Sequence, residues 1–90
     1  MAITVQIPAP MRAHTDGATC VEVSGATVQA ALADLGVKHP ALIERMFDGA
    51  ALKRFMNLYV NDEDIRYLEE LNTPLKDGDE LSIIPAVAGG

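Results

Sequence analysis

The sequence predicts an α+β fold in which one main helix packs across one face of a mixed β-sheet of about five strands, with a short second helix in addition. Two segments near each end of the chain alternate apolar and polar residues, which is the period of a half-buried strand. A segment between them repeats its apolar residues with helical spacing. The chain has 90 residues, of which 49% are hydrophobic, with two Phe, two Tyr and no Trp. One small domain with an aliphatic core is therefore expected.

The first two strands are predicted at residues 2–7 and 19–23. Pro8 ends the first strand because proline cannot donate a hydrogen bond to a ladder. The connection that follows contains the turn-forming pair Asp16-Gly17, so we expect an antiparallel hairpin with a long loop. The apolar positions of the two strands are Ile3, Val5, Ile7, Val21 and Val23.

The main helix is predicted to follow Thr27, which suits an N-cap position, and to end at Gly36 as its C-cap. Pro40 suits the start of a second, shorter helix that ends before Gly49. The apolar residues of the main helix recur at positions i, i+3, i+4 and i+7, namely Val28, Ala31, Leu32 and Leu35.

The C-terminal half is predicted to return to strands. Residues 55–60 alternate like a strand, residues 61–64 form a polar turn, and residues 65–67 form a short return strand. After a single turn around Pro74, the last strand covers residues 81–85.

The predicted order of elements is strand, strand, helix, strand, short strand, strand, on one mixed sheet. This is the order of the β-grasp, or ubiquitin-like, fold. We expect residues 1–85 to form the β-grasp domain and residues 86–90 to form a flexible C-terminal tail.

Charge and cysteine content narrow the class of function. Seven basic and thirteen acidic residues give a net charge of −6, which opposes binding to nucleic acid and favours a basic partner surface. No segment approaches the roughly 18 apolar residues of a membrane span, and the N-terminus lacks a signal-peptide pattern. A cytoplasmic protein that binds neither nucleic acid nor membrane is therefore expected. Cys20 is the only cysteine, which excludes an intramolecular disulfide.

No side chain is predicted to be catalytic or to bind a metal. His14 and His39 lack metal-ligand spacing and are expected to be solvated. Residues 62–64 and 77–80 form two acidic groups that could bind a divalent cation, but polar turns are the preferred interpretation because calcium-loop spacing is missing. Cys20 has no neighbouring base in sequence and is interpreted as a plain strand thiol.

The remaining unusual feature is the ending Gly89-Gly90, which follows the last predicted strand by way of Val87 and Ala88. Small residues can extend into a narrow channel, and glycine leaves the terminal carbonyl without an adjacent Cβ. An ATP-using partner could adenylate the Gly90 carboxylate, after which sulfide or a thiol could attack it. In that case the chain is a substrate and not an enzyme. The alternative is a frayed terminus without a role.

Residues 75–90, from Leu75-Lys76-Asp77-Gly78 to Gly89-Gly90, resemble the C-terminal motif of the MoaD/ThiS family of ubiquitin-like sulfur carriers. Residues 57–66 are closest to the CysO subgroup of that family, and residues 7–17 also resemble it. The resemblance implies that an E1-like, MoeB-type enzyme adenylates Gly90 and converts it to a thiocarboxylate, and that Gly89, Ala88 and Val87 contact the partner's channel.

The subgroup implies that the sulfur enters cysteine biosynthesis, through a pyridoxal-phosphate-dependent cysteine synthase and a metalloprotease that releases cysteine. The resemblance then assigns ATP, pyridoxal phosphate and zinc to the partner enzymes, and no cofactor to the chain itself. Sulfur transfer to molybdopterin, thiamin or a secondary metabolite remains open. So do a ubiquitin-like modifier that is joined to lysines and a plain binding module.

Overall fold

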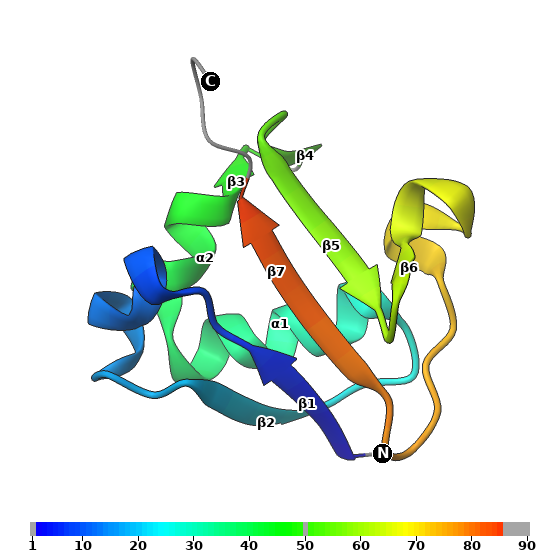
Figure 1. The fold of residues 1–90 in the computed structure, drawn as a ribbon, viewed down its shortest axis with the longest axis horizontal. Coiled ribbons are helices and arrows are strands. Elements are labelled where there is room, and N and C mark those ends of the chain that lie inside the picture. The colour runs from blue at the N-terminus through cyan, green and yellow to red at the C-terminus, as the bar shows by residue number, and fades with distance from the viewer. Residues whose placement is uncertain (1, 50, 86–90) are drawn as a thin grey trace.

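The computed structural model of the protein describes residues 2–49 and 51–85 (Figure 1). The main sheet has five strands in the order β2-β1-β7-β5-β6. The last strand, β7, lies in the middle, parallel to β1 and antiparallel to β5, while β1 and β2 form the predicted antiparallel hairpin. The strands are β1 (Ala2–Gln6), β2 (Cys20–Ser24), β5 (Met56–Val60), β6 (Glu63–Asp64) and β7 (Glu80–Pro85).

Two α-helices cover one face of this sheet, as Figure 1 shows. They are α1 (Val28–Lys38) and α2 (Pro40–Met46). Short 3-10 helices fill the connections: η1 (Ala9–Thr15), η2 (Ile65–Tyr67) and η3 (Glu70–Asn72). A small second sheet pairs β3 (Phe47–Asp48) with β4 (Ala51–Leu52). The predicted β-grasp architecture, with one main and one short helix, is confirmed.

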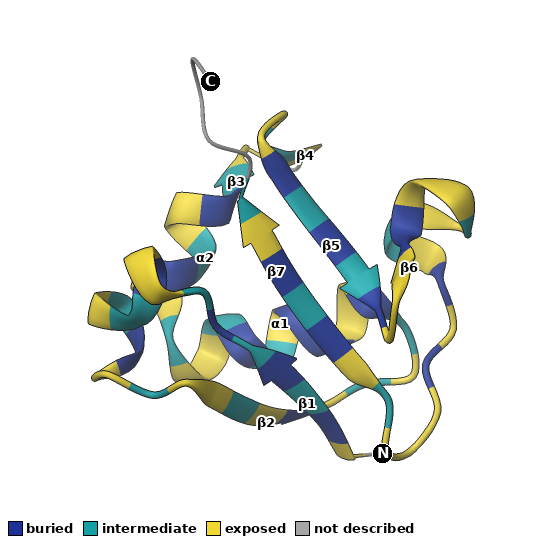
Figure 2. Ribbon diagram, in the orientation of Figure 1, coloured by how far each residue is buried: buried dark blue, intermediate teal, exposed yellow. Residues whose placement is uncertain are grey.

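The core lies between the sheet and the two helices, and Figure 2 shows the alternation of buried and exposed residues along the strands. Successive side chains of a strand point to opposite faces, so every second residue meets the helices. The core is aliphatic, as expected from the composition. Its fully enclosed side chains include Ile3, Val5, Ile7, Val23, Val28, Leu35, Leu42, Met46, Leu58 and Leu81.

The main helix begins as predicted but ends later than predicted. The hydroxyl of Thr27 accepts a hydrogen bond from the main-chain N of Ala30 at 3.1 Å, which is the expected N-cap. Gly36 is not the C-cap, because the helix continues to Lys38 and His39 caps it. The residue before a proline is disfavoured in helical conformation, so Pro40 explains the end of α1 better than the glycine does.

Gly36 has a packing role instead. A Cβ at this position would lie 3.0 Å from Cγ1 of Ile43, so its absence lets α2 approach α1 closely.

The predicted return strand at residues 65–67 is wrong, because these residues form η2. The chain reverses earlier than expected: Asn61 adopts a positive φ of 56°, and Val60 already pairs with Glu63. The return strand is therefore β6. The connection between β1 and β2 also differs from the expected loop, since most of it forms η1. Within the described residues, no helix is long and apolar enough to cross a membrane.

Candidate functional site

The predicted sulfur-carrying residue, Gly90, and the predicted channel contacts Gly89, Ala88 and Val87 lie outside the described residues. The predicted tail, residues 86–90, does so as a whole. The structure instead describes the strand that precedes this segment, β7, and its surroundings.

Strand β7 pairs with β5 from Leu81 to Pro85, but with β1 only from Glu80 to Ser82. Pro85 pairs with Met56 at the start of β5, and Leu81 lies between Val5 of β1 and Val60 of β5. Leu81 and Ile83 point into the core, whereas Ile84 is 46% exposed on the opposite face. The C-terminal end of β7 is therefore held by its pairing with β5 and by the buried side chain of Ile83.

Basic residues gather at the same end of the sheet as Pro85. Lys53 and Arg54 lie just before β5 and are separated from it by Phe55. The first residue of β5, Met56, pairs with Pro85, and its main-chain N donates a hydrogen bond to the Lys53 carbonyl at 2.9 Å. The main-chain N of Lys53 donates to the carbonyl of Met46 at 2.9 Å, which places the end of α2 beside this turn. Arg45 lies in the last turn of that helix.

Acidic residues gather at the opposite end, where β7 begins. Asp77 accepts a hydrogen bond from the main-chain N of Ala2 at 2.7 Å, and Asp79 accepts one from the main-chain N of Lys76 at 2.8 Å. Asp62 lies in the turn between β5 and β6, and Glu63 follows it as the first residue of β6, beside the start of β7. Asp62 and Asp77 lie in turns as expected, whereas Glu63 and Asp64 form β6 and Glu80 begins β7.

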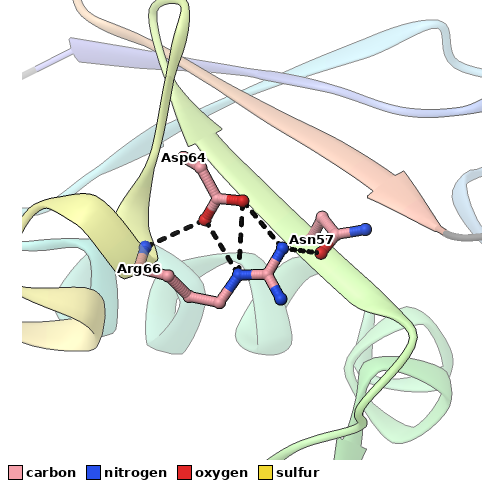
Figure 3. A network of polar contacts seen from close by, with 3 residues as sticks. All are labelled: Asn57, Asp64 and Arg66. Atoms are coloured by element: carbon pink, nitrogen blue, oxygen red, sulfur yellow. Dashed lines mark hydrogen bonds and ion pairs between the residues drawn. The ribbon is translucent and has the colours of Figure 1, made fainter.

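Asp64 is buried, and sequence reasoning missed its role. Its carboxylate accepts a 2.8 Å hydrogen bond from Nη2 of Arg66 and a 2.9 Å bond from the main-chain N of Arg66. The same Nη2 donates to Oδ1 of Asn57 at 2.6 Å. The guanidinium of Arg66 therefore links β6 to β5, as Figure 3 shows. The bonds from Arg66 hold the pKa of Asp64 below its usual range, against the opposing effect of burial.

A cleft of about 660 Å³ lies between the start of β5 and the segment η2–η3. Its charged lining carries both signs, with three basic residues, Lys53, Arg54 and Arg66, and three acidic residues, Asp64, Glu69 and Glu70. The sequence did not indicate this cleft, because its two sides are separated by the return strand and become neighbours only on folding.

The other residues singled out from the sequence lie apart from this end or in separate elements. His14 belongs to η1 and His39 caps α1, and both are partly buried, not fully solvated as expected. Cys20 is an exposed, free thiol on the edge strand β2. Within the ranges 2–49 and 51–85, no three His, Cys, Asp or Glu side chains are arranged to hold a metal ion.

Comparison with known proteins adds the family context. A model described as the ThiS family matches residues 5–90. Sulfur carrier protein CysO of Mycobacterium tuberculosis is 45% identical over 93 aligned positions, which cover 100% of both chains.

Two solved structures match over nearly the whole chain. A chain in the crystal structure of the Amycolatopsis orientalis BexX/CysO complex superposes with a TM-score of 0.92 and 47% identity, covering 99% of this chain and 100% of that chain. The solution structure of small archaeal modifier protein 1 from Methanosarcina acetivorans gives a TM-score of 0.88 and 34% identity, covering 99% of this chain and 96% of that chain.

Proposed function

This chain belongs to the ThiS family, as its C-terminal motif predicted, and we propose that it is a sulfur carrier on which partner enzymes act, and not itself an enzyme. One observation carries the proposal. The family match extends through Gly90, so the segment that would carry the sulfur is part of the family likeness and not an addition to it.

The proposed chemistry takes place on the Gly90 carboxylate. An oxygen of the carboxylate attacks the α-phosphorus of ATP on an E1-like, MoeB-type enzyme, and pyrophosphate leaves. Sulfide from a donor then attacks the carbonyl carbon, the bond to the AMP oxygen breaks, and a thiocarboxylate remains. Gly89 and Gly90 favour this attack because neither places a Cβ beside the carbonyl. Ala88 and Val87 are the proposed contacts with the partner's channel.

The domain supplies a rigid base for this segment. The pairing of Pro85 with Met56 holds the end of β7, and the buried Ile83 anchors the strand in the core. Five residues follow Pro85, and even a fully extended chain of five residues spans at most about 18 Å. For Gly90 to reach an active site, the end of the domain that carries Pro85 must therefore come close to the partner.

We propose cysteine biosynthesis as the destination of the sulfur, because CysO is 45% identical over its full length. The partners would then be a pyridoxal-phosphate-dependent cysteine synthase and a metalloprotease that releases cysteine from Gly90. ATP, pyridoxal phosphate and zinc would be bound by the partner enzymes. Molybdopterin, thiamin and secondary-metabolite synthesis are the alternative destinations.

Intact-mass analysis tests the proposal. The protein is incubated with ATP, a sulfide source and the E1-like enzyme from the same genome. We expect the mass increase for the exchange of one oxygen for sulfur, located at Gly90 by fragmentation. A variant that lacks Gly89 and Gly90 is the matched control and should not change. The enzyme is first shown to be active by its adenylation of a known carrier protein. If the mass of the full chain then stays unchanged, the proposal is overturned.

A second candidate function is a ubiquitin-like protein modifier joined through Gly90 to lysines of other proteins. The 34% identity to a small archaeal modifier protein over almost the whole chain favours it. Both functions begin with adenylation, so loading experiments cannot separate them. Branched peptides in which Gly90 is joined to a lysine of another cellular protein would establish conjugation. If cells contain the thiocarboxylate but no such peptides, only the carrier function is supported.

A further inference from the structure

Residues of opposite charge lie beside the two ends of β7, although the overall charge of the protein is −6. We call Lys53 and Arg54 the basic corner; it lies next to Met56, the partner of Pro85. The opposite end of β7 carries Asp77, Asp79 and Glu80, together with the acidic turn between β5 and β6. Figure 1 shows these two ends at the top and the bottom of the molecule.

The basic corner has no ion-pair partner among residues 2–49 and 51–85. The ion pairs described there are Lys38 with Asp34 and Arg66 with Asp64. Arg54 is exposed and Lys53 is half-exposed, so both cations can reach a second molecule. Glu44 and Asp48 lie in the neighbouring elements α2 and β3 and reduce the local positive charge without forming an ion pair with either cation in the described residues.

The positions of these charged residues determine which end of the protein a charged partner surface attracts. A basic partner surface, which the net charge led us to expect, would attract the acidic end and turn Pro85 away. An acidic partner surface would attract the basic corner and repel the acidic end, so that encounters occur with the end of β7 in front. Charge complementarity of this kind raises association rates and suppresses wrong orientations.

We propose that the basic corner docks on an acidic surface at the entrance to the activating enzyme's active site. The inference rests on the proposed function, because only a short segment separates Pro85 from Gly90 and the two surfaces must meet. Lys53 and Arg54 lie beside the end of β7 that carries Pro85, since Met56 bonds to Lys53 and pairs with Pro85.

Association kinetics with the E1-like enzyme from the same genome test this inference. The variants Lys53→Glu and Arg54→Glu are compared with Lys76→Glu, which changes the net charge equally but lies in the exposed turn at the acidic end. At about 0.1 M salt, where the screening length is about 10 Å, we expect each corner variant to associate roughly 3- to 10-fold more slowly. Lys76→Glu should associate within about twofold of the unaltered protein. Thermal unfolding checks that all three variants fold.

The outcomes separate this inference from the proposed function. Equal effects of Lys53→Glu and Lys76→Glu, or faster association of the corner variants, would overturn the acidic docking surface while sulfur loading could still succeed. Slower association of the corner variants with no mass change at Gly90 would support the docking surface and overturn the sulfur-carrier chemistry. If the unaltered protein neither binds nor is loaded, both are overturned.

Discussion

The carboxylate of Asp34 on α1 accepts a hydrogen bond from the main-chain N of Ser24 on β2, at 2.9 Å. One helical turn later, Nζ of Lys38 donates to the main-chain carbonyl of Glu22 at 2.8 Å and pairs with Asp34 at 3.2 Å. Strand β2 is the edge of the sheet, and its outer main-chain groups would otherwise be open to another strand. The side chains of Asp34 and Lys38 thus form hydrogen bonds with the outer main-chain groups of Ser24 and Glu22.

Removal of both side chains should expose this edge. We expect the double variant Asp34→Ala, Lys38→Ala to associate with itself more strongly as concentration rises, because unpaired strand groups act as a template for another chain. Sedimentation velocity over a range of concentrations measures this. Glu44→Ala, an exposed change on α2, is the control and should behave as the unaltered protein does. Identical sedimentation of all three would show that the edge is protected by other means.

Stability should decline at acid pH through two carboxyls. The hydrogen bond from Ser24, followed by that from Lys38, lowers the pKa of Asp34, and the bonds from Arg66 lower the pKa of Asp64. A carboxyl whose pKa is lower in the folded chain stabilises the fold above its unfolded pKa of about 3.9. That contribution is lost as the pH falls through the folded-state pKa.

Urea unfolding at a series of pH values from neutrality into the acid range measures this dependence. In Asp64→Asn the free energy of unfolding should fall less steeply below about pH 4 than in the unaltered protein. The reason is that asparagine has no carboxyl group to take up a proton on unfolding. Asp62→Asn, in the exposed turn nearby, is measured alongside as the control for removing one acidic side chain. A slope that Asp64→Asn leaves unchanged would contradict the assignment.

Asp64 should also matter at neutral pH. Its carboxylate satisfies the main-chain N of Arg66 and accepts from the guanidinium, while its own side chain is 6% exposed. We expect Asp64→Ala to lower the free energy of unfolding by about 1–2 kcal/mol, since a polar group loses its partner. Asp62→Ala should change it by less than about 0.5 kcal/mol, as is usual for exposed sites. Equal effects of the two changes would argue against the network as a source of stability.

Gly25 should tolerate no side chain. A Cβ there would lie 2.8 Å from the carbonyl carbon of Ala30 and closer still to the main-chain N of Ala31. Main-chain atoms of a helix cannot move aside cheaply, so Gly25→Ala should cost about 2 kcal/mol or more, as overpacked sites do. Gly49→Ala is the comparison: among the described residues nothing lies within 4 Å of a Cβ added there, but φ is +68°.

At Gly49 we expect a smaller loss, about 1 kcal/mol, from backbone conformation alone. Chemical denaturation of both variants gives the difference. A Gly25→Ala protein as stable as the unaltered one would mean that the start of α1 can shift.

Elements with a strong local pattern were predictable from the sequence. The alternation in β1, β5 and β7 and the helical spacing from Val28 to Leu35 report burial directly, because a residue's face follows from its position in a regular element. The 3-10 helices were not predictable in this way. In η1, Arg12 Nε donates to the carbonyl of Ile7 at 3.1 Å, and the side chain of Thr15 is buried. Neither feature produces a regular spacing of apolar residues in the sequence.

Asp64 shows why the candidate site could be only partly predicted. In sequence it is one of three consecutive acidic residues, with nothing to distinguish it from Asp62. Its role comes from the reversal at Asn61, which directs it toward Arg66, whose guanidinium also reaches Asn57. The return strand begins at Glu63, two residues earlier than expected, and this places Asp64 in a strand as a buried partner of Arg66.

By itself, the sequence determined the order of elements, the aliphatic core and the position of Gly89-Gly90 after the last strand, because periodicity and turn residues act locally. Only the tertiary structure decided where the charges lie relative to that segment. The pairing of Met56 with Pro85 brings the basic corner to one end of β7, and the pairing of Thr4 with Glu80 marks the acidic end. These partners are far apart in the chain, and contacts between strands are set by the packing of the whole sheet.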